Sequence, residues 1–570
     1  MLCQEGVLKA LRGMDLVIFE ENKPFVLEAL RNGEFDYMEG ASEVFEADFF
    51  RFIKARALLD RLAETCPTPR KKEDVPFWFY VASNLSMRLH GVHAFDAFPM
   101  VVRCGGMLQA FGPKAGRKLV HPDTQETTVF CEGFNRKNHY DRETPCDPDY
   151  LRKVAKDTDA GVLMEWFNRD VLRVFRKHRA FDPEGIFIGD GSYLFVADNP
   201  NYEGSVKLLF DEDNHPVDLE QYRKMTEAQK VRCQWKRCYK MVTLLHTNRR
   251  REFFLFAAVK VISGRDHESP VLYELVDQFV QTVGLGVIKR LILDRGFLDG
   301  EAISRCKKRY GVDILIPLRR NMDLYADALA LFRESDVPWV EVKEQPEEEK
   351  VPLRPKPPVI RKREEKRQKR LQQLKDQQPP PPPEKIRVKT EAASIGEFRS
   401  WSSCTVPLSV VANREHYADG HQEIWFLVDT KEVRDPRQPR QEYHLRPSTE
   451  ERYRQLKCFS DLTHFTSRAF SMVTNQVVFI MLAYDLLQIF LLRQGRKDLT
   501  PKTLPRIRQQ LLPSDNYIMV YWQNYYGLFR PFELVGFVVM LGEEARKKIA
   551  AKCRRIGREL NGLMQNPRAP

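Results

Sequence analysis

The stretch SPVLYELVDQFVQTVGLGVIKRLILD, residues 269–294, decides the fold class of this chain. Apolar residues recur at helical spacing from Val271 to Val283, which predicts a helix. The apolar run 287–294 that follows predicts a strand ending in Asp294. Beyond it, Gly311 predicts the end of a second helix, and residues 313–318 predict one more strand.

Further apolar runs precede this stretch, at 185–190, 205–210, 241–246 and 253–262. The last two flank the polar segment TNRRRE, residues 247–252, and predict a hairpin. Several strands followed by helix, strand, helix and strand predict an α/β fold with a mixed sheet.

Composition and patterning divide the chain into regions of different character. The predicted boundaries are 1–180 for a mostly helical N-terminal region, 181–335 for the first part of the α/β core, 336–400 for a charged, proline-rich inserted linker, 401–442 for β strands that return to the core, 443–495 for its second part, and 496–570 for a basic and aromatic C-terminal region. The linker holds five consecutive prolines and the basic run 361–370, which suit a solvated spacer. A DNA contact or a partner-binding segment is the alternative.

The composition excludes a largely disordered chain and indicates an acidic partner. The 570 residues are 43% hydrophobic, which suffices for a sizeable core. They carry 91 Lys and Arg against 79 Asp and Glu, a formal charge of +12. Such an excess is typical of proteins that bind nucleic acid or a membrane surface, and composition alone does not choose between them.

Cysteine usage and hydropathy favour a soluble, cytoplasmic protein. The 11 cysteines include no CxxC pair, which favours reduced thiols over a disulfide framework. The N-terminal residues show no signal-peptide pattern. The most apolar stretch, 477–492, is shorter than the about 20 residues of a bilayer span and contains Asp485. It therefore predicts a buried core helix and no membrane contact.

Two aspartates stand where predicted strands end. Asp190 precedes Gly191 and Ser192, and Asp294 precedes Arg295 and Gly296. Carboxylates at strand ends are held rigidly and can face one point, as a metal site requires. Taken singly, each has a plainer explanation, since Asp-Gly is a common turn dipeptide.

A third acid belongs to a more specific pattern. Tyr443, Arg446, Glu450 and Lys457 follow the spacing Y-x2-R-x3-E-x6-K and would fall within about 60° of one another on a helix. An acid flanked by cations and a hydroxyl suits a metal ligand beside phosphate contacts. The alternative is a solvated, charged helix face.

The start of that helix affects which side chains share the face. Pro447 fits a first helical turn, and Ser448 to Glu451 has the sequence of a capping box, so the helix is expected to begin near 447 or 448. Tyr443 and Arg446 would then precede it. Glu451 is offset from Glu450 by about 100°, and we therefore prefer Glu450 as the ligand.

These motifs resemble those of DDE transposases of bacterial insertion sequences, in the insertion-sequence-four-like subgroup with the Y-R-E-K signature. The resemblance covers about residues 185–335 and 405–490. It departs from the usual pattern at Pro447, where related sequences commonly have tryptophan. It implies a ribonuclease-H-like core in which Asp190, Asp294 and Glu450 bind two Mg²⁺ ions, with Mn²⁺ as a possible substitute.

The resemblance also implies the reaction and its partners. The expected reaction cuts double-stranded DNA at the terminal inverted repeats of an element and joins the 3′ ends to target DNA by two-metal phosphoryl transfer. Tyr443, Arg446 and Lys457 are expected to contact the transposon end, and 1–180 to bind the DNA ends. A homodimer in the DNA complex and association with the nucleoid are further expectations. A nuclease without strand transfer and a domesticated DNA-binding protein without catalysis are the alternatives.

Other residues are candidates on weaker grounds. Basic side chains on the predicted hairpin could hold DNA phosphates or form a solvated edge, namely Lys236, Arg237, Lys240, Arg249, Arg250 and Arg251. The basic segment 543–560 is predicted to be a helix that contacts DNA or supports a dimer. His246 and His267 are interpreted as structural, and Cys233 and Cys238 as ordinary thiols without metal.

Overall fold

The structure, a computed structural model, is described for two units of the chain. One unit spans Leu163–Thr503, and the other combines Met1–Val162 with Leu504–Pro570. The described residues are 16–17, 20–41, 44–70, 75–98, 116–120, 127–130, 146–343, 387–511, 517–523 and 525–565.

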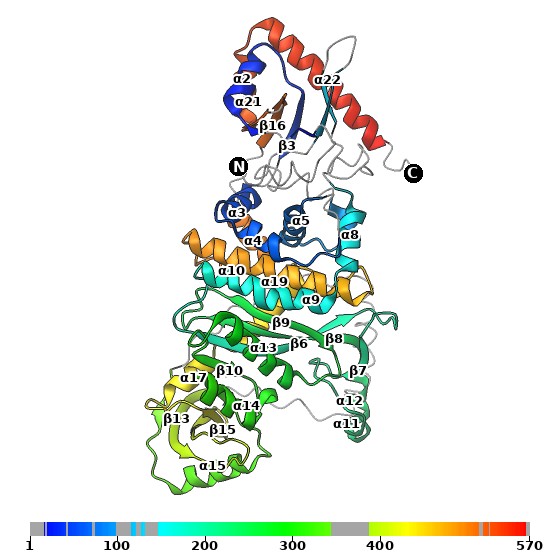
Figure 1. The fold of residues 1–570 in the computed structure, drawn as a ribbon. Helices are drawn as coiled ribbons and strands as arrows, with labels where there is room; N and C mark the ends of the chain where they lie inside the picture. Colours follow the sequence, from blue (N-terminus) through cyan, green and yellow to red (C-terminus); the bar gives the residue numbers. More distant parts are fainter. Residues whose placement is uncertain are drawn as a thin grey trace. The chain divides into compact units, whose positions relative to one another are not determined.

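A ten-stranded mixed sheet organises the unit Leu163–Thr503 (Figure 1). The strand order is β12-β13-β14-β15-β11-β10-β6-β8-β7, and β9 pairs with β8 off this path. The strands are β6 (Ile186–Val196), β7 (Val206–Phe210), β8 (Gln234–Thr247), β9 (Leu255–Ser263), β10 (Arg290–Leu293), β11 (Asp313–Pro317), β12 (Val340–Glu341), β13 (Arg387–Phe398), β14 (Leu408–Tyr417) and β15 (Gln422–Asp429). The predicted α/β class with a mixed sheet is confirmed.

The register of the central strands places the two aspartates side by side. β10 runs parallel to β6, with Leu293 opposite Gly189, so that Asp294 follows beside Asp190 at the next position. β8 runs antiparallel to β6 and places Thr243 opposite Asp190. β10 lies between β11 and β6, and its apolar residues are buried, so the strand that precedes Asp294 is held rigidly inside the sheet.

Helices cover both faces and one edge of this sheet. The helices of the unit are η3 (Phe167–Val171), α10 (Leu172–Lys177), α11 (Leu219–Lys224), α12 (Glu227–Arg232), α13 (Glu268–Val283), α14 (Gly300–Arg305) continued by η5 (Cys306–Tyr310), α15 (Asp323–Glu334), α17 (Arg437–Tyr443), α18 (Pro447–Phe459) and α19 (Phe470–Arg493). Asn168 of η3 donates to the carbonyl of Val259 and accepts its N–H, both at 2.9 Å. The Asn168 side chain thus satisfies backbone groups on the outer edge of β9. An edge strand that is covered in this way cannot pair with another chain.

Most of the predicted core elements are confirmed, but two central strands are longer than predicted. β6 continues to Val196, so Asp190 lies inside the strand and not at its end, and β8 already begins at Gln234. β8 and β9 form the predicted hairpin, and α13 matches the helix read from the apolar periodicity. Gly311 ends the helix α14–η5 in the left-handed conformation, with φ of 70°, as its role at a helix end requires.

The predicted linker 336–400 is wrong at both of its ends. β12 and β13 lie inside these limits and join the large sheet, β13 pairing along most of its length with β14. Ala392 and Ala393 point to opposite faces of β13 and are both buried, so this part of the strand lies inside the unit and not in a solvated linker. The polyproline run and the basic run 361–370 lie outside the described residues.

The apolar stretch 477–492 lies within α19. This helix is long and apolar enough to cross a membrane by length and composition, and 89% of its most apolar window is buried inside the protein. Asp485 of α19 is buried and accepts a hydrogen bond from the backbone N–H of Phe256 at 2.7 Å. α19 therefore packs as a core helix, as predicted.

The second unit joins the two ends of the chain. Its four-stranded sheet has the order β2-β17-β16-β3, so strands from the C-terminal part (β16, Tyr517–Trp522; β17, Tyr525–Phe529) pair with strands from the N-terminal part (β2, Glu20–Glu21; β3, Tyr37–Ala41). The core of this sheet contains Val26, Phe35, Val520 and Phe529. The two regions predicted as 1–180 and 496–570 thus contribute strands to one sheet.

The remaining described elements of this unit are mostly helical. They are β1 (Leu16–Val17), α2 (Lys23–Arg31), α3 (Val44–Ala55), α4 (Leu58–Thr65), α5 (Phe77–Leu89), η1 (Phe95–Ala97), β4 (Gly116–Val120), β5 (Thr127–Phe130), α8 (Pro148–Asp157), α20 (Leu504–Leu511), α21 (Pro531–Val539) and α22 (Glu543–Gln565), with α9 (Ala160–Trp166) leading into the other unit. The predicted basic helix 543–560 corresponds to α22.

Candidate functional site

Asp190 and Asp294 lie at the centre of the large sheet. Asp190 is 6% exposed on β6, and its Oδ1 accepts the N–H of Gly191 at 2.9 Å. Burial raises the pKa of the Asp190 carboxyl to about 7, although the Arg446 guanidinium acts in the opposite direction. Asp294 directly follows β10 and precedes the short turn η4 (Arg295–Phe297).

Arg446 contacts all three predicted metal ligands. Its NH2 lies 3.7 Å from Asp190 Oδ1 and 3.4 Å from Asp294 Oδ2, and its NH1 lies 2.7 Å from Glu450 Oε1. The three carboxylates therefore surround a single guanidinium. Because like charges at such distances repel, a cation among them stabilises the group.

The donor set suits a divalent metal ion. Three carboxylates that converge on one position supply oxygen ligands, which hard cations such as Mg²⁺ prefer. The position at which they converge is one that a cation, the guanidinium of Arg446, already favours. Asp190, Asp294 and Glu450 therefore supply oxygen donors of the kind that such a site requires, and their role as metal ligands stays a prediction.

Glu451 points to different partners from Glu450. Its carboxylate accepts hydrogen bonds from Arg454 Nε at 2.6 Å and from Gln455 Nε2 at 2.8 Å. It is 8% exposed, whereas the Glu450 side chain is 58% exposed. Adjacent helical positions differ by about 100°, and this offset separates the two carboxylates.

The signature is divided between two helices. Tyr443 is the last residue of α17, and α18 begins at Pro447 with Arg446 as its N-cap. The helix start is confirmed, but the predicted capping box is wrong, because Ser448 Oγ is buried without a hydrogen-bond partner. Arg446 contacts the acids from the N-cap position of α18. These contacts therefore do not depend on the four signature residues sharing one helical face.

Tyr443 and Lys457 contact different strands of the sheet. Burial raises the pKa of the Tyr443 phenol, and its ring lies 6.1 Å from that of Trp425 on β15. Lys457 Nζ donates to Ser192 Oγ at 2.7 Å and to the carbonyl of Tyr193 at 2.9 Å. Burial lowers the pKa of Lys457 to about 8. The signature lysine is thus anchored to the strand that carries Asp190.

The sequence motifs did not reveal Tyr453. Its hydroxyl donates to the carbonyl of Asp190 at 3.1 Å and lies 2.6 Å from Thr243 Oγ1. Tyr453 is three residues after Glu450 on α18, so it faces the sheet on the adjacent turn. The only available signal was an aromatic residue at helical spacing, which is equally typical of a core position.

The basic residues predicted on the hairpin have mixed surroundings. Lys240 is 7% exposed and donates to the carbonyl of Asp266 at 3.0 Å, so it has little access to phosphate. Arg249 pairs with Glu442 at 3.0 Å, and Arg251 donates to the carbonyl of His444 at 2.7 Å. Arg250 is exposed.

Lys236 and Arg237 belong to the part of β8 that pairs with β7. Lys236 Nζ donates to Asn214 Oδ1 at 2.5 Å, and Arg237 NH1 donates to Ser205 Oγ at 3.3 Å. Both side chains remain partly accessible. Phosphate contact by this strand stays a prediction.

His246 is enclosed in the core of the sheet. Its Nε2 accepts the N–H of Asp182 at 2.8 Å, which leaves Nδ1 to donate to the carbonyl of Ile186 at 2.9 Å. Burial lowers the pKa of His246 to about 4. His267 caps α13, its Nδ1 accepting the N–H of Ser269 at 3.3 Å. Both contacts are structural, as predicted.

The neutral His246 should make stability depend on pH. Its pKa is near 6.5 in an unfolded chain and about 4 here, so only the unfolded chain binds this proton between these values. The contribution is complete above pH 6.5 and is lost as the pH falls toward 4, at roughly 3 kcal/mol in total. We expect urea titrations to show a smaller fall in stability over this range for His246→Gln than for the native chain. Equal slopes would contradict the assignment.

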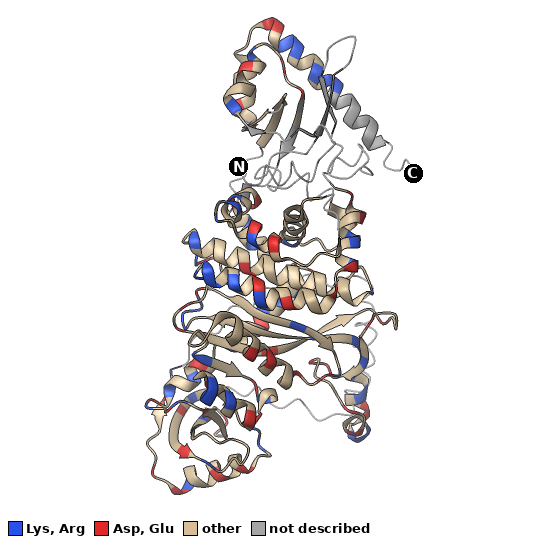
Figure 2. Ribbon diagram, viewed as in Figure 1, with Lys and Arg blue, Asp and Glu red and all other residues tan. Residues whose placement is uncertain are grey.

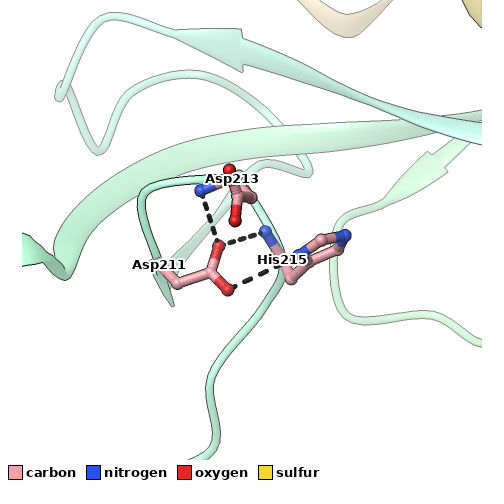
Figure 3. Close-up of side chains that lie close together, drawn as sticks. All are labelled: Asp211, Asp213 and His215. Atoms are coloured by element: carbon pink, nitrogen blue, oxygen red, sulfur yellow. Dashed lines mark hydrogen bonds and ion pairs between the residues drawn. The ribbon is translucent and has the colours of Figure 1, made fainter. Parts of the chain in front are cut away.

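Among the described residues, one set of His and acidic side chains has its possible ligand atoms within 4.8 Å of one another. Asp211, Asp213 and His215 gather in the turn after β7, as Figure 3 shows. Asp211 Oδ1 accepts the N–H groups of Asp213 and His215 at 3.0 and 2.8 Å, so this carboxylate closes the turn. The group is largely exposed, and its contacts are those of an ordinary Asx turn. Cys233 and Cys238 share no ligand group with it; Cys233 Sγ contacts Met225 Sδ at 3.7 Å.

Charge is intermixed rather than gathered on one element. Figure 2 shows Lys, Arg, Asp and Glu alternating on several helices of both units. On α22, Lys547 and Lys548 pair with Glu543 and Glu544 at 2.8 and 3.4 Å. The net positive charge of this helix is therefore smaller than its count of basic residues indicates.

Comparison with known proteins identifies the region that contains this site. Residues 204–486 match the family described as transposase DDE domain. The matched residues include Asp294, Arg446 and Glu450, whereas Asp190 lies upstream of the first matched residue. A search of curated proteins finds no match to the chain.

Proposed function

We propose that the chain is a transposase that cuts the ends of an insertion sequence and joins the 3′ ends to target DNA, because residues 204–486 match the family described as transposase DDE domain. We also propose that it belongs to the subgroup with the Y-R-E-K signature, through Tyr443, Arg446, Glu450 and Lys457. The observation that carries the proposal is the convergence of Asp190, Asp294 and Glu450 on Arg446.

Asp190, Asp294 and Glu450 are the residues proposed to hold divalent metal, as two Mg²⁺ ions. Bound there, the metal supplies Lewis acidity to a scissile phosphate and lowers the pKa of an attacking hydroxyl or water. The fold holds these side chains in place. The paired strands β6 and β10 position the two aspartates, and the Tyr453 hydroxyl donates a hydrogen bond to the carbonyl of Asp190. Glu450 approaches from a separate helix and is exposed, so its position can adjust when the site is filled.

The basic and aromatic residues around the acids are proposed to position DNA. Arg446 and Lys457 carry the charge that a phosphate requires, and Tyr443 can stack or donate from the opposite side. A homodimer in the DNA complex would allow both ends of the element to be cut together. Analytical ultracentrifugation of the chain with and without paired end DNA would test this, and a monomeric complex would contradict it.

Removing Arg446 should separate two effects. Without the guanidinium, the three carboxylates lose their internal cation, so Arg446→Ala should bind Mn²⁺ several-fold more tightly in the absence of DNA. DNA cleavage should nevertheless fall, because a phosphate contact is lost. Mn²⁺ titration followed by electron paramagnetic resonance measures the first effect. Arg454→Ala, which removes a partner of Glu451 on the same helix, is the matched control and should leave Mn²⁺ affinity unchanged.

The proposed reaction is tested with a supercoiled plasmid that carries the element's own paired ends, the full chain and Mg²⁺. Excised and integrated products are expected. Nicked or linear products without integration would favour a nuclease that lacks strand transfer. Binding without any cleavage would favour a DNA-binding protein, and would overturn the proposed reaction.

A further inference from the structure

The helix α21 is apolar on every side. Its sequence, PFELVGFVV, has a single charged residue, Glu533. A helix that is hydrophobic all round is typical of a core element that is buried on all sides. On α21, however, only Leu534 is fully buried, and Phe537 and Val538 are partly buried against the same core. The unit to which α21 belongs therefore covers one face of this helix.

The opposite face of α21 is exposed. Phe532 is 90% exposed, Val535 57%, Val539 61%, and Met540, which caps the helix, 86%. At 100° per residue these positions form a stripe about 140° wide, opposite the buried face. Gly536 lies on the same stripe, and a Cβ there would meet no other atom within 4 Å. We call these five residues the α21 face.

The α21 face is the main concentration of exposed apolar side chains in the described part of the chain. Of the 11 large hydrophobic side chains that are exposed there, four belong to it. The other seven are distributed over several elements of both units. Single exposed apolar side chains are ordinary, whereas a contiguous group of them marks a surface that binds a partner.

The charges around the α21 face do not suit DNA. Residues 531–545 contain no Lys or Arg, and their only charged residues are Glu533, Glu543 and Glu544. Lys23 of α2 pairs with Glu533 at 2.5 Å. Binding to DNA phosphates or to an anionic membrane requires cationic side chains beside the apolar ones. An apolar face with acidic borders fits a protein surface instead.

The helix that follows is complementary to a second copy of itself. The first turn of α22 carries Glu543 and Glu544, and the next turn carries Lys547 and Lys548. These side chains pair within the helix at 2.8 and 3.4 Å and are all more than half exposed. Exposed pairs of this kind are weak and can exchange partners. Two antiparallel copies of α22 would therefore place an acidic turn beside a basic turn on both sides.

We propose that the α21 face packs against the α21 face of a second copy of this chain, in a two-fold symmetric interface. This inference rests on the proposed function, in which two copies cut both ends of an element, and it names the surface that joins them. The exposed side chains of the face supply roughly half of the about 800 Å² that each partner contributes to a standard interface. The adjoining charged turns of α22 would extend the contact.

The mass of the full chain in solution tests the inference. Light scattering after size exclusion gives this mass with and without end DNA, over a range of concentrations. We expect the double variant Phe532→Ser, Met540→Ser to raise the dissociation constant of the dimer by about 100-fold. Leu219→Ser is the matched control, because Leu219 is 57% exposed on α11 in the other unit. It should leave the dissociation constant unchanged.

Cysteine crosslinking identifies the occupant of the face. Residues near a two-fold axis lie close to their own counterparts in the partner. Val535→Cys or Val539→Cys should therefore form a disulfide-linked dimer of the full chain under mild oxidation. Leu219→Cys should form no more than the native chain, whose own cysteines set the background. If neither position on α21 crosslinks above that background, a second copy does not cover the face and the inference is overturned.

The outcomes separate this inference from the proposed function. If the native chain forms dimers and the double variant forms them equally well, only the assignment of the interface is overturned. If the native chain is monomeric with and without end DNA, the proposed homodimer and the inference are overturned together. Thermal unfolding of each variant shows whether it is folded, and the replaced side chains are exposed, so we expect an unchanged midpoint.

Discussion

Replacing Glu450 by glutamine should lower the rate of DNA cleavage by about 10³-fold or more, which corresponds to about 4 kcal/mol of transition-state stabilisation. Glutamine keeps the size of the side chain and removes only its charge. Glu450 is exposed and its carboxylate contacts Arg446, so the substitution removes a proposed metal ligand without opening the core. Asp190→Asn and Asp294→Asn should cause losses of the same order.

Glu451→Gln is the matched control for this prediction. It changes the same residue type at the neighbouring position, where the carboxylate pairs with Arg454. We expect it to reduce stability and to leave the cleavage rate of the folded protein within about 10-fold of the native value. Rates are measured by single-turnover cleavage of end DNA in Mg²⁺. A larger loss in Glu451→Gln than in Glu450→Gln would show that the ligand has been assigned to the wrong glutamate.

Replacing Arg290 by alanine should lower the free energy of unfolding of the unit Leu163–Thr503 by about 3–5 kcal/mol. Arg290 NH1 and NH2 each donate to Asp429 at 2.6 Å, and Nε donates to Glu442 at 2.7 Å. Asp429 and Glu442 are 1% and 6% exposed. Without the guanidinium, the buried Asp429 carboxylate would lose its counter-charge and Glu442 would keep only the more exposed Arg249, which is the costly way to break a buried ion pair.

The Arg290 contacts also connect the parts of the site. Arg290 begins β10, which ends before Asp294, while Glu442 precedes Tyr443 on α17 and Asp429 ends β15. Urea unfolding followed by circular dichroism measures the stability loss. Arg305→Ala is the control, because its pair with Asp277 is exposed and should contribute far less. Equal losses in the two variants would contradict a stabilising role for the buried group.

Local patterning was enough to predict the elements of the core. The apolar periodicity from Val271 to Val283 predicted α13, and the runs around Asp190 and Asp294 predicted β6 and β10. These predictions succeed because a buried strand or an amphipathic helix requires its own residues to be apolar at a fixed period. The spacing of the signature also favours Glu450 over Glu451 as a ligand, and the two carboxylates do have different partners, although the ligand assignment stays a prediction.

Other features required partners that are distant in the chain. The predicted capping box at Ser448 does not form, because Arg446 occupies the N-cap and turns toward the acids instead. The sequence predicts a linker where β12 and β13 lie. Their pairing cannot be seen in either segment alone, because β12 pairs with β13 and β13 pairs with the distant β14. The joining of β3 with β16 is likewise invisible in either segment alone.

The sequence by itself determined the α/β class, the end of β10 before Asp294, and the helix that carries Glu450. It placed a strand end at Asp190, whereas β6 continues to Val196. Tertiary structure alone decided that these acids meet around Arg446. The physical reason is that periodicity records which residues are buried in an element. Convergence of charges depends instead on strand register and helix placement, which are set by contacts between segments far apart in the chain.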